Sequence, residues 1–163
     1  MTDRKIPKTH DPKTIRNTLI LLAFIVLVGL GLRLTQKDGD AGVTEALFVI
    51  NSGSITAEIA DTPEKKELGL GERAYLEPRH GMYFPFPAAH KLVFWMKGMR
   101  FPIDAIWIRD GVVVDVTYDA RPPSGDAIQR FSPREAADAV LEINAGEAEE
   151  LNVRKGDTVR IRY

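Results

Sequence analysis

The chain has 163 residues, of which 44% are hydrophobic and 28% charged, a composition that indicates one ordinary folded domain. It contains no cysteine, which excludes a disulfide framework, a thiolate zinc site and a cysteine nucleophile. The formal net charge of −1 hides an asymmetry: residues 1–34 carry six Lys or Arg against two Asp, whereas the remaining 129 residues carry 16 basic and 21 acidic groups. An acidic domain binds polyanions poorly, so we expect no nucleic-acid partner.

The N-terminal part predicts a membrane tether. Residues 1–17 are polar and basic, and we expect them to be disordered. Residues 18–34, TLILLAFIVLVGLGLRL, are apolar on all sides apart from their ends, and as a helix they would span about 26 Å. Such a segment can cross a membrane if Arg33 snorkels outward, so we predict a transmembrane anchor. A cleaved signal sequence is the alternative, since residues 39–41 form a weak cleavage pattern, and residues 35–44 form a linker.

The folded part should be a single β-rich domain over residues 45–163. Short apolar or alternating runs separated by turn residues predict eight strands, at residues 47–50, 54–61, 83–86, 92–97, 103–109, 112–118, 139–144 and 158–163. Two short helices are expected, at residues 62–68 and 146–151, and residues 119–138 should be irregular. The connections look too short for parallel crossovers. We therefore predict a mostly β (α+β) fold, a small, mainly antiparallel barrel or sandwich.

Most of the aromatic residues and three of the Met lie in one stretch, residues 80–109, HGMYFPFPAAHKLVFWMKGMRFPIDAIWIR. The strand at 92–97 is apolar on both faces, with Val93, Trp95 and Lys97 on one face and Leu92, Phe94 and Met96 on the other. Such a strand is either covered on both sides or has one face open as a groove.

The domain resembles one bacterial and archaeal family, the domain of unknown function 192. The residues that carry the resemblance are Thr62-Pro63, Gly69-Leu70, Arg73, Leu76, Gly81-Met82, Phe94-Trp95-Met96-Lys97, Pro102-Ile103-Asp104, residues 140–146 (VLEINAG) and Gly156-Asp157. Two positions depart from the family pattern: Gly71 stands where the family usually has Met, and Gly98-Met99 where it usually has Asn-Thr. The resemblance implies a β-rich fold and frequent export or membrane tethering, and it supplies no activity.

Five residues are candidates for binding a ligand: Trp95, Lys97, Asp104, Arg73 and Glu142. Asp104 shares a strand face with Ile106 and Ile108, so it is either a structural acceptor for turn amides or for Arg73, or a carboxylate at the rim of a pocket. Glu142 is expected to pair with an Arg or a Lys.

The residues favour binding over catalysis. An exposed Trp95 beside Asp104 and Lys97 is typical of a surface that binds a carbohydrate or a peptide. The expected partners are the membrane itself and either a cell-envelope ligand or a membrane protein. The alternative is a small cell-envelope hydrolase in which Asp104 and Glu142 act as an acid–base pair across one cleft.

No cofactor or metal is expected. His80 and His90 lie ten residues apart, without a ligand spacing such as His-x-x-His. No glycine-rich phosphate loop follows a strand, and no serine stands in a nucleophile-elbow pattern.

The membrane orientation is testable. Five basic residues precede the apolar segment at 18–34 and only Arg33 and Lys37 lie at or just after its end, which predicts a cytoplasmic N-terminus and a domain outside the cytoplasm. A reporter enzyme fused after Tyr163 should therefore be active only in its extracytoplasmic form. Activity of a reporter that works only in the cytoplasm would contradict the orientation.

Overall fold

The computed structural model describes residues 44–124 and 128–163. The predictions for the N-terminal part concern the disordered residues 1–17, the transmembrane segment 18–34 and all but the last residue of the linker 35–44, and they lie outside the described residues. Within the described ranges, no helix has the length and apolar character needed to cross a bilayer.

The described residues form nine strands and two short helices. In chain order these are β1 (Glu45–Ile50), β2 (Gly53–Ile59), α2 (Pro63–Leu68), β3 (His80–His90), β4 (Phe94–Trp95), β5 (Ile103–Arg109), β6 (Val112–Ala120), β7 (Arg130–Phe131), β8 (Ala137–Asn144), α3 (Glu147–Glu150) and β9 (Val159–Arg162). The fold class, mostly β with two short helices, is as predicted. The strand expected at 92–97 is reduced to the two residues of β4, and the segment expected to be irregular contains β7, its antiparallel partner.

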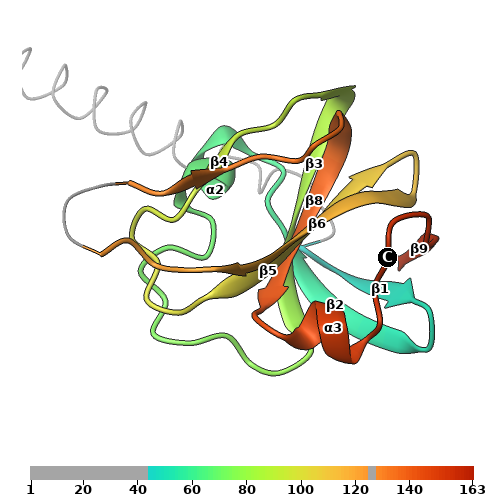
Figure 1. The fold of residues 1–163 in the computed structure, drawn as a ribbon, viewed down its shortest axis with the longest axis horizontal. Helices are drawn as coiled ribbons and strands as arrows, with labels where there is room; N and C mark the ends of the chain where they lie inside the picture. Colours follow the sequence, from blue (N-terminus) through green and yellow to red (C-terminus); the bar gives the residue numbers. More distant parts are fainter. Residues whose placement is uncertain (1–43, 125–127) are drawn as a thin grey trace, which may run out of the picture. The chain divides into compact units, whose positions relative to one another are not determined.

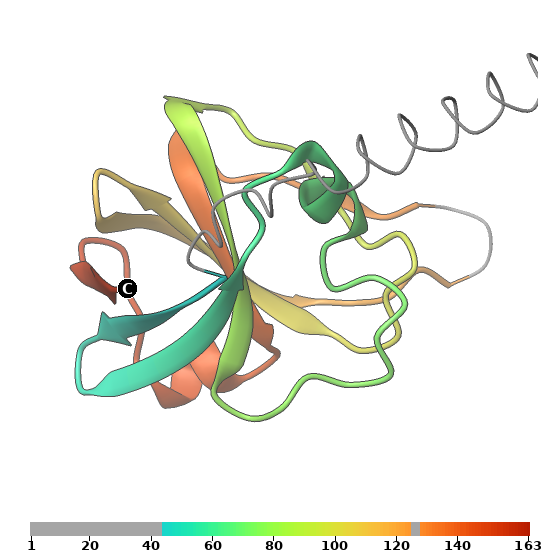
Figure 2. The ribbon, with the colours of Figure 1, turned by 180° about the vertical axis from the view of Figure 1, so that it is seen from behind.

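Seven of the strands form one curled sheet in the order β6-β5-β8-β3-β2-β1-β9 (Figures 1 and 2). The prediction of a barrel or sandwich is wrong in its detail, because the sheet is a half-barrel that does not close. Near the start of the edge strands β6 and β9, the chain forms one bridge, between Val112 and Thr158, and a few backbone hydrogen bonds beside it, such as that from the Val159 amide to the Gly111 carbonyl. The last strand has only four residues, and they pair with β1, so no continuous ladder joins the two edges.

The sheet is mainly antiparallel, as expected, but it contains one parallel pair, between β2 and β3. Residues 60–79, which include α2, carry the chain from the end of β2 back to the start of β3. The expectation that the connections were too short for a parallel crossover was therefore wrong. This crossover places α2 over the face of the sheet on which the separate strand β4 also lies.

Hydrophobic side chains cover both faces of the central strands. One buried cluster includes Ile106, Leu141 and Ile143, and the other includes Phe84 and Trp107. Adjacent residues of a strand point to opposite faces, so β5 and β8 contribute to both clusters. This explains why the sequence of β5, IDAIWIR, is apolar at both odd and even positions.

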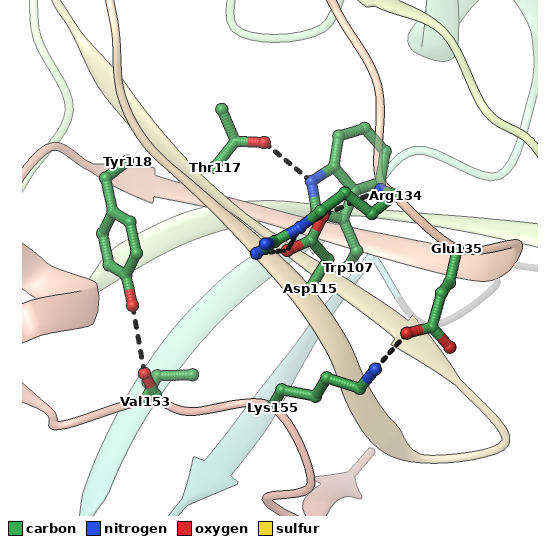
Figure 3. Close-up of polar contacts among 8 residues, drawn as sticks. All are labelled: Trp107, Asp115, Thr117, Tyr118, Arg134, Glu135, Val153 and Lys155. Atoms are coloured by element: carbon green, nitrogen blue, oxygen red, sulfur yellow. Dashed lines mark hydrogen bonds and ion pairs between the residues drawn. The ribbon is translucent and has the colours of Figure 1, made fainter.

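The segment before β8 is tied to β6 through one carboxylate (Figure 3). Asp115 accepts hydrogen bonds from the backbone amide of Arg134 at 2.8 Å and from its guanidinium at 2.7 Å. Burial acts against ionisation of Asp115, but these hydrogen bonds hold its pKa below the usual value. The tie fixes β7, whose Phe131 packs on Phe94 of β4 with ring centroids 6.2 Å apart. Asp115 thereby helps to hold the short strand that carries Trp95.

Candidate functional site

The best-formed hollow in the described residues is a pocket of about 300 Å³ between α2 and the sheet. Its walls come from α2 and the turn that follows it, from β3, and from residues 93–99. Its lining consists of Pro63, Lys66, Glu67, Leu68, Gly69, Leu70, Gly71, Phe84, Phe86, Val93, Phe94, Trp95, Lys97, Met99 and Glu142. The lining is mainly apolar and aromatic, with a few polar groups, which is the usual character of a small-molecule site.

The wall on the helix side depends on caps at both ends of α2. Thr62 accepts a hydrogen bond from the backbone amide of Lys65, and Pro63 occupies the first turn. The helix ends at Gly69, whose φ of 53° is unfavourable for residues with a side chain. Gly71 then passes so close to the Leu68 carbonyl that an added Cβ would lie 2.8 Å from its oxygen. The tight turn keeps this wall beside the sheet.

The opposite wall follows the alternation expected for residues 92–97. Leu92 and Met96 are buried in the core, whereas Val93, Trp95 and Lys97 point out of it and line the pocket. Three apolar side chains at the pocket are strongly exposed: Leu68 at 57%, Val93 at 56% and Trp95 at 41%. They form an apolar collar (Leu68, Val93 and Trp95) at the pocket, and a molecule bound there would remove it from water.

Glu142 lies in the pocket lining and is only 4% exposed. It stands in the middle of β8, between β3 and β5, where the neighbouring amides are committed to the sheet ladders. Within residues 44–124 and 128–163 no hydrogen-bond donor or cation is paired with its carboxyl, so the expected ion pair with an Arg or a Lys is not formed. Burial raises the pKa of Glu142 to about 8.

Two lysines at the pocket contribute positive charge. The Lys66 ammonium donates a hydrogen bond to the Pro85 carbonyl at 2.5 Å and lies 4.5 Å from the centroid of the Phe86 ring. These two contacts hold the Lys66 side chain against the wall of the pocket. Lys97 is exposed and lies beside Trp95.

Asp104 lies on the other face of the sheet. Cross-strand partners in an antiparallel ladder point to the same face, and Glu142 is the partner of Ala105 whereas Asp104 is the partner of Ile143. The two carboxyls therefore point in opposite directions and cannot share a cleft. This contradicts the alternative prediction of a hydrolase that uses Asp104 and Glu142 as an acid–base pair.

The partners of Asp104 are backbone amides near the end of β6 and at the start of α3, so Asp104 is a structural acceptor, as in one of the alternatives considered from the sequence. Its fully buried carboxylate accepts hydrogen bonds from the backbone amides of Asp119 at 2.9 Å, Gly146 at 2.9 Å and Ala148 at 3.1 Å. Burial raises the pKa of Asp104, and the three amides act in the opposite direction. Asp104 joins the end of β6 and the start of α3 to β5. The helix α3 lies well away from α2 (Figures 1 and 2).

Arg73 is not part of the pocket lining either. Its guanidinium forms a bidentate ion pair with Glu58, with N···O distances of 2.6 and 2.8 Å. The pair is only partly buried and lies on β2 and the crossover that follows it. Of the five sequence candidates, the structure thus brings together Trp95, Lys97 and Glu142 and leaves Asp104 and Arg73 elsewhere.

Sequence reasoning missed the helix side of the pocket. Lys66 and Leu68 of α2 and Phe84 and Phe86 of β3 line it, and none of them was a candidate. One signal was present in the sequence: Leu68 ends a short, otherwise polar helix, where an apolar side chain has no core to enter. Among the described residues no three His, Asp or Glu side chains converge as metal ligands.

Comparison with known proteins identifies an uncharacterised family and two similar crystal structures. The model of the DUF192 family, described as "Uncharacterized ACR", matches residues 47–161. A crystal structure of a candidate transcription regulator from Sinorhizobium meliloti is similar, with 34% sequence identity, a TM-score of 0.65 and coverage of 72% of this chain and 92% of that one. A protein of unknown function from Novosphingobium aromaticivorans is 28% identical, with a TM-score of 0.62 and coverage of 71% and 83%. No curated protein matches.

The departures from the family pattern described above fall at this pocket. Gly71 and Met99 line it, and Gly98 lies in the shallower hollow beside it. A side chain at position 71 would meet the Leu68 carbonyl oxygen and, at 3.3 Å, that of Lys97. Two of the positions at which the sequence was expected to depart from the family pattern, Gly71 and Met99, thus contribute to the lining of this pocket.

Asp104→Asn should destabilise the domain by about 2–4 kcal/mol, because an amide group offers one acceptor oxygen and turns its NH₂ toward backbone donors. Asp138→Asn is the control, since Asp138 accepts a single exposed hydrogen bond, from the Asp110 amide. Chemical denaturation of both variants checks this. An Asp104→Asn variant as stable as the natural protein would refute the structural role.

Glu142→Gln should stabilise the domain increasingly as the pH rises. Below about pH 4.5 the Glu142 carboxyl is protonated in both the folded and the unfolded chain, so the free energy of unfolding does not depend on pH through this group. Between there and its folded pKa of about 8 only the unfolded chain ionises, which favours unfolding. The stability difference between variant and natural protein should grow by up to about 1.4 kcal/mol per pH unit over this interval. Denaturation curves from acid to mildly alkaline pH measure it, with the exposed Glu67→Gln as control. A pH-independent difference would show that Glu142 has another partner in solution.

Proposed function

We propose that this chain, which belongs to the DUF192 family, is a binding module that takes a small and largely apolar ligand into the pocket between α2 and the sheet. The observation that carries the proposal is the pocket itself, with its exposed apolar collar and its buried Glu142, which has no partner among the residues that the structure describes. A volume of about 300 Å³ is at the lower end of the range for small-molecule sites. The ligand is therefore compact, or only one end of a larger molecule enters the pocket.

The collar supports a binding role. Soluble domains seldom gather large exposed apolar side chains around a concavity without a use for them. Leu68, Val93 and Trp95 come from two separate segments that are held together only by the fold. A ligand that covers them gains from apolar burial and from stacking on the Trp95 ring.

The module acts outside the cytoplasm and is tethered to the membrane through residues 18–34. The support for this part is the sequence: an apolar segment preceded by basic residues, and a linker of polar and small residues after it. A tether of this kind keeps the pocket near the membrane surface. The ligand is then a cell-envelope molecule or a group presented by a membrane protein.

A role in binding DNA receives less support. One similar structure is that of a candidate transcription regulator. The part of this chain after residue 34 carries 16 basic and 21 acidic groups, and binding to phosphate backbones depends on a positive surface. Catalysis by two carboxylates is not proposed either, because Asp104 and Glu142 point to opposite faces of the sheet.

The proposal predicts saturable binding of a neutral apolar probe. N-phenyl-1-naphthylamine becomes fluorescent in apolar surroundings and carries no charge, so its binding tests the pocket independently of Glu142. Trp95→Ala should weaken its binding by roughly 1–2 kcal/mol. Tyr118→Ala is the matched control, because Tyr118 is 42% exposed, close to the 41% of Trp95, and lies outside the pocket. Absence of saturable binding, or an equal effect of both variants, would refute the pocket as a binding site.

A further inference from the structure

We propose that the group bound in this pocket is an organic ammonium, held between the Glu142 carboxylate and the aromatic wall. The inference rests on the proposed function, since it names the chemical class of the ligand for the same pocket. It concerns a primary, methylated or quaternary ammonium on a small or partly apolar molecule.

The first support is the position of Glu142. A carboxyl buried in an apolar site must stay protonated or meet a positive charge, because an unpaired buried carboxylate is strongly unfavourable. Among the described residues no cation is paired with Glu142, and Glu142 belongs to the lining of the pocket. A cationic ligand would complete an ion pair that the folded chain leaves incomplete.

The second support is that the nearby cations have other positions. Arg73 is held by two hydrogen bonds to Glu58. Lys66 is held by the Pro85 carbonyl and the Phe86 ring. Lys97 lies on the exposed face of residues 92–97. The contacts of Arg73 and Lys66 hold these two cations away from Glu142, and Lys97 is exposed to solvent, so the place beside Glu142 is open to a cation from outside the chain.

The third support is the aromatic wall. Phe94 meets Phe84 at a centroid distance of 5.1 Å and an interplanar angle of 88°, and Phe86 at 6.3 Å and 80°. With Trp95 these rings line the pocket, and the face of an aromatic ring attracts a cation. Lys66 already places an alkylammonium 4.5 Å from the Phe86 centroid, within the distance at which such attraction operates.

The charged groups that face the pocket are Lys66 and Glu67 from α2, Lys97 from the segment after β4, and Glu142 from β8. The Glu58–Arg73 ion pair lies two strands away from Glu142. Glu58 on β2 is the cross-strand partner of Met82 on β3, and Met82 is the cross-strand partner of Glu142 on β8. With Glu142 ionised the two acids offset the two lysines. The bound cation is therefore attracted by the buried carboxylate and the rings rather than by a general excess of negative charge.

A matched pair of probes separates charge from shape. Choline carries a quaternary ammonium that cannot lose a proton, and 3,3-dimethyl-1-butanol replaces its nitrogen by carbon at almost the same size. Binding of both is followed through the indole NMR signal of Trp95, from about pH 6 to about pH 9. Choline should bind more tightly than the alcohol. Its affinity should rise up to about tenfold per pH unit and level off above the pKa of Glu142, as the carboxyl ionises.

Two variants locate the effect. Glu142→Gln should weaken choline binding by about tenfold or more while leaving the alcohol bound, since an amide keeps the shape and removes the charge. Glu77→Gln removes one exposed negative charge outside the pocket lining and should change choline affinity by less than about threefold.

Three outcomes would overturn the inference: equal or tighter binding of the alcohol, a choline affinity independent of pH, or equal losses in the two variants. If choline fails to bind while N-phenyl-1-naphthylamine still binds, the pocket stands as a binding site and its ligand is neutral. If neither binds, the proposed function fails as well.

Discussion

The constraint on which the site depends is the burial of Glu142 in the middle of a fully paired sheet. The amides around it belong to the β3–β8 and β5–β8 ladders, so they cannot turn toward its carboxyl. Asp104 is buried as deeply but lies near the start of its strand, where the amides of Asp119 near the end of β6 and of Gly146 and Ala148 at the start of α3 donate to it. The position along the strand thus explains the difference between the two residues: the Asp104 carboxylate has hydrogen-bond donors, and the Glu142 carboxyl faces the pocket. The unfavourable burial of Glu142 is tolerated because the rest of the sheet is well packed.

The pocket around Glu142 is built by connections rather than by the sheet alone. The parallel crossover between β2 and β3 brings α2 over this face, and glycines at its C-terminal end keep the turn close. On the other side, the hydrogen bonds between Asp115 and Arg134 hold β7, which in turn pairs with β4 and supports Trp95 (Figure 3). Both walls are therefore fixed by the fold before any ligand arrives, which lowers the entropic cost of binding.

Much of this could be read from the sequence because it depends on local patterns. The alternation in residues 92–97 places Trp95 and Lys97 on one side, and Thr62-Pro63 marks the start of α2. The relation between Asp104 and Glu142 could not be read, since it depends on the long-range register in which Ala105 meets Glu142, and a shift of one residue would have reversed it. The parallel pair was missed for a similar reason: nothing local indicates that residues 60–79 cross over rather than turn back.

The account makes Glu142 the centre of the site, and its ionisation in the folded protein is the most direct test. The side-chain carboxyl carbon of Glu142 can be followed by NMR in selectively ¹³C-labelled protein while the pH is raised, with Glu142→Gln used to assign the signal. The account predicts a titration midpoint near the pKa of about 8 that burial imposes. A midpoint near the ordinary glutamate value of about 4.3 would mean that the carboxyl is solvated or already paired, and it would contradict the account.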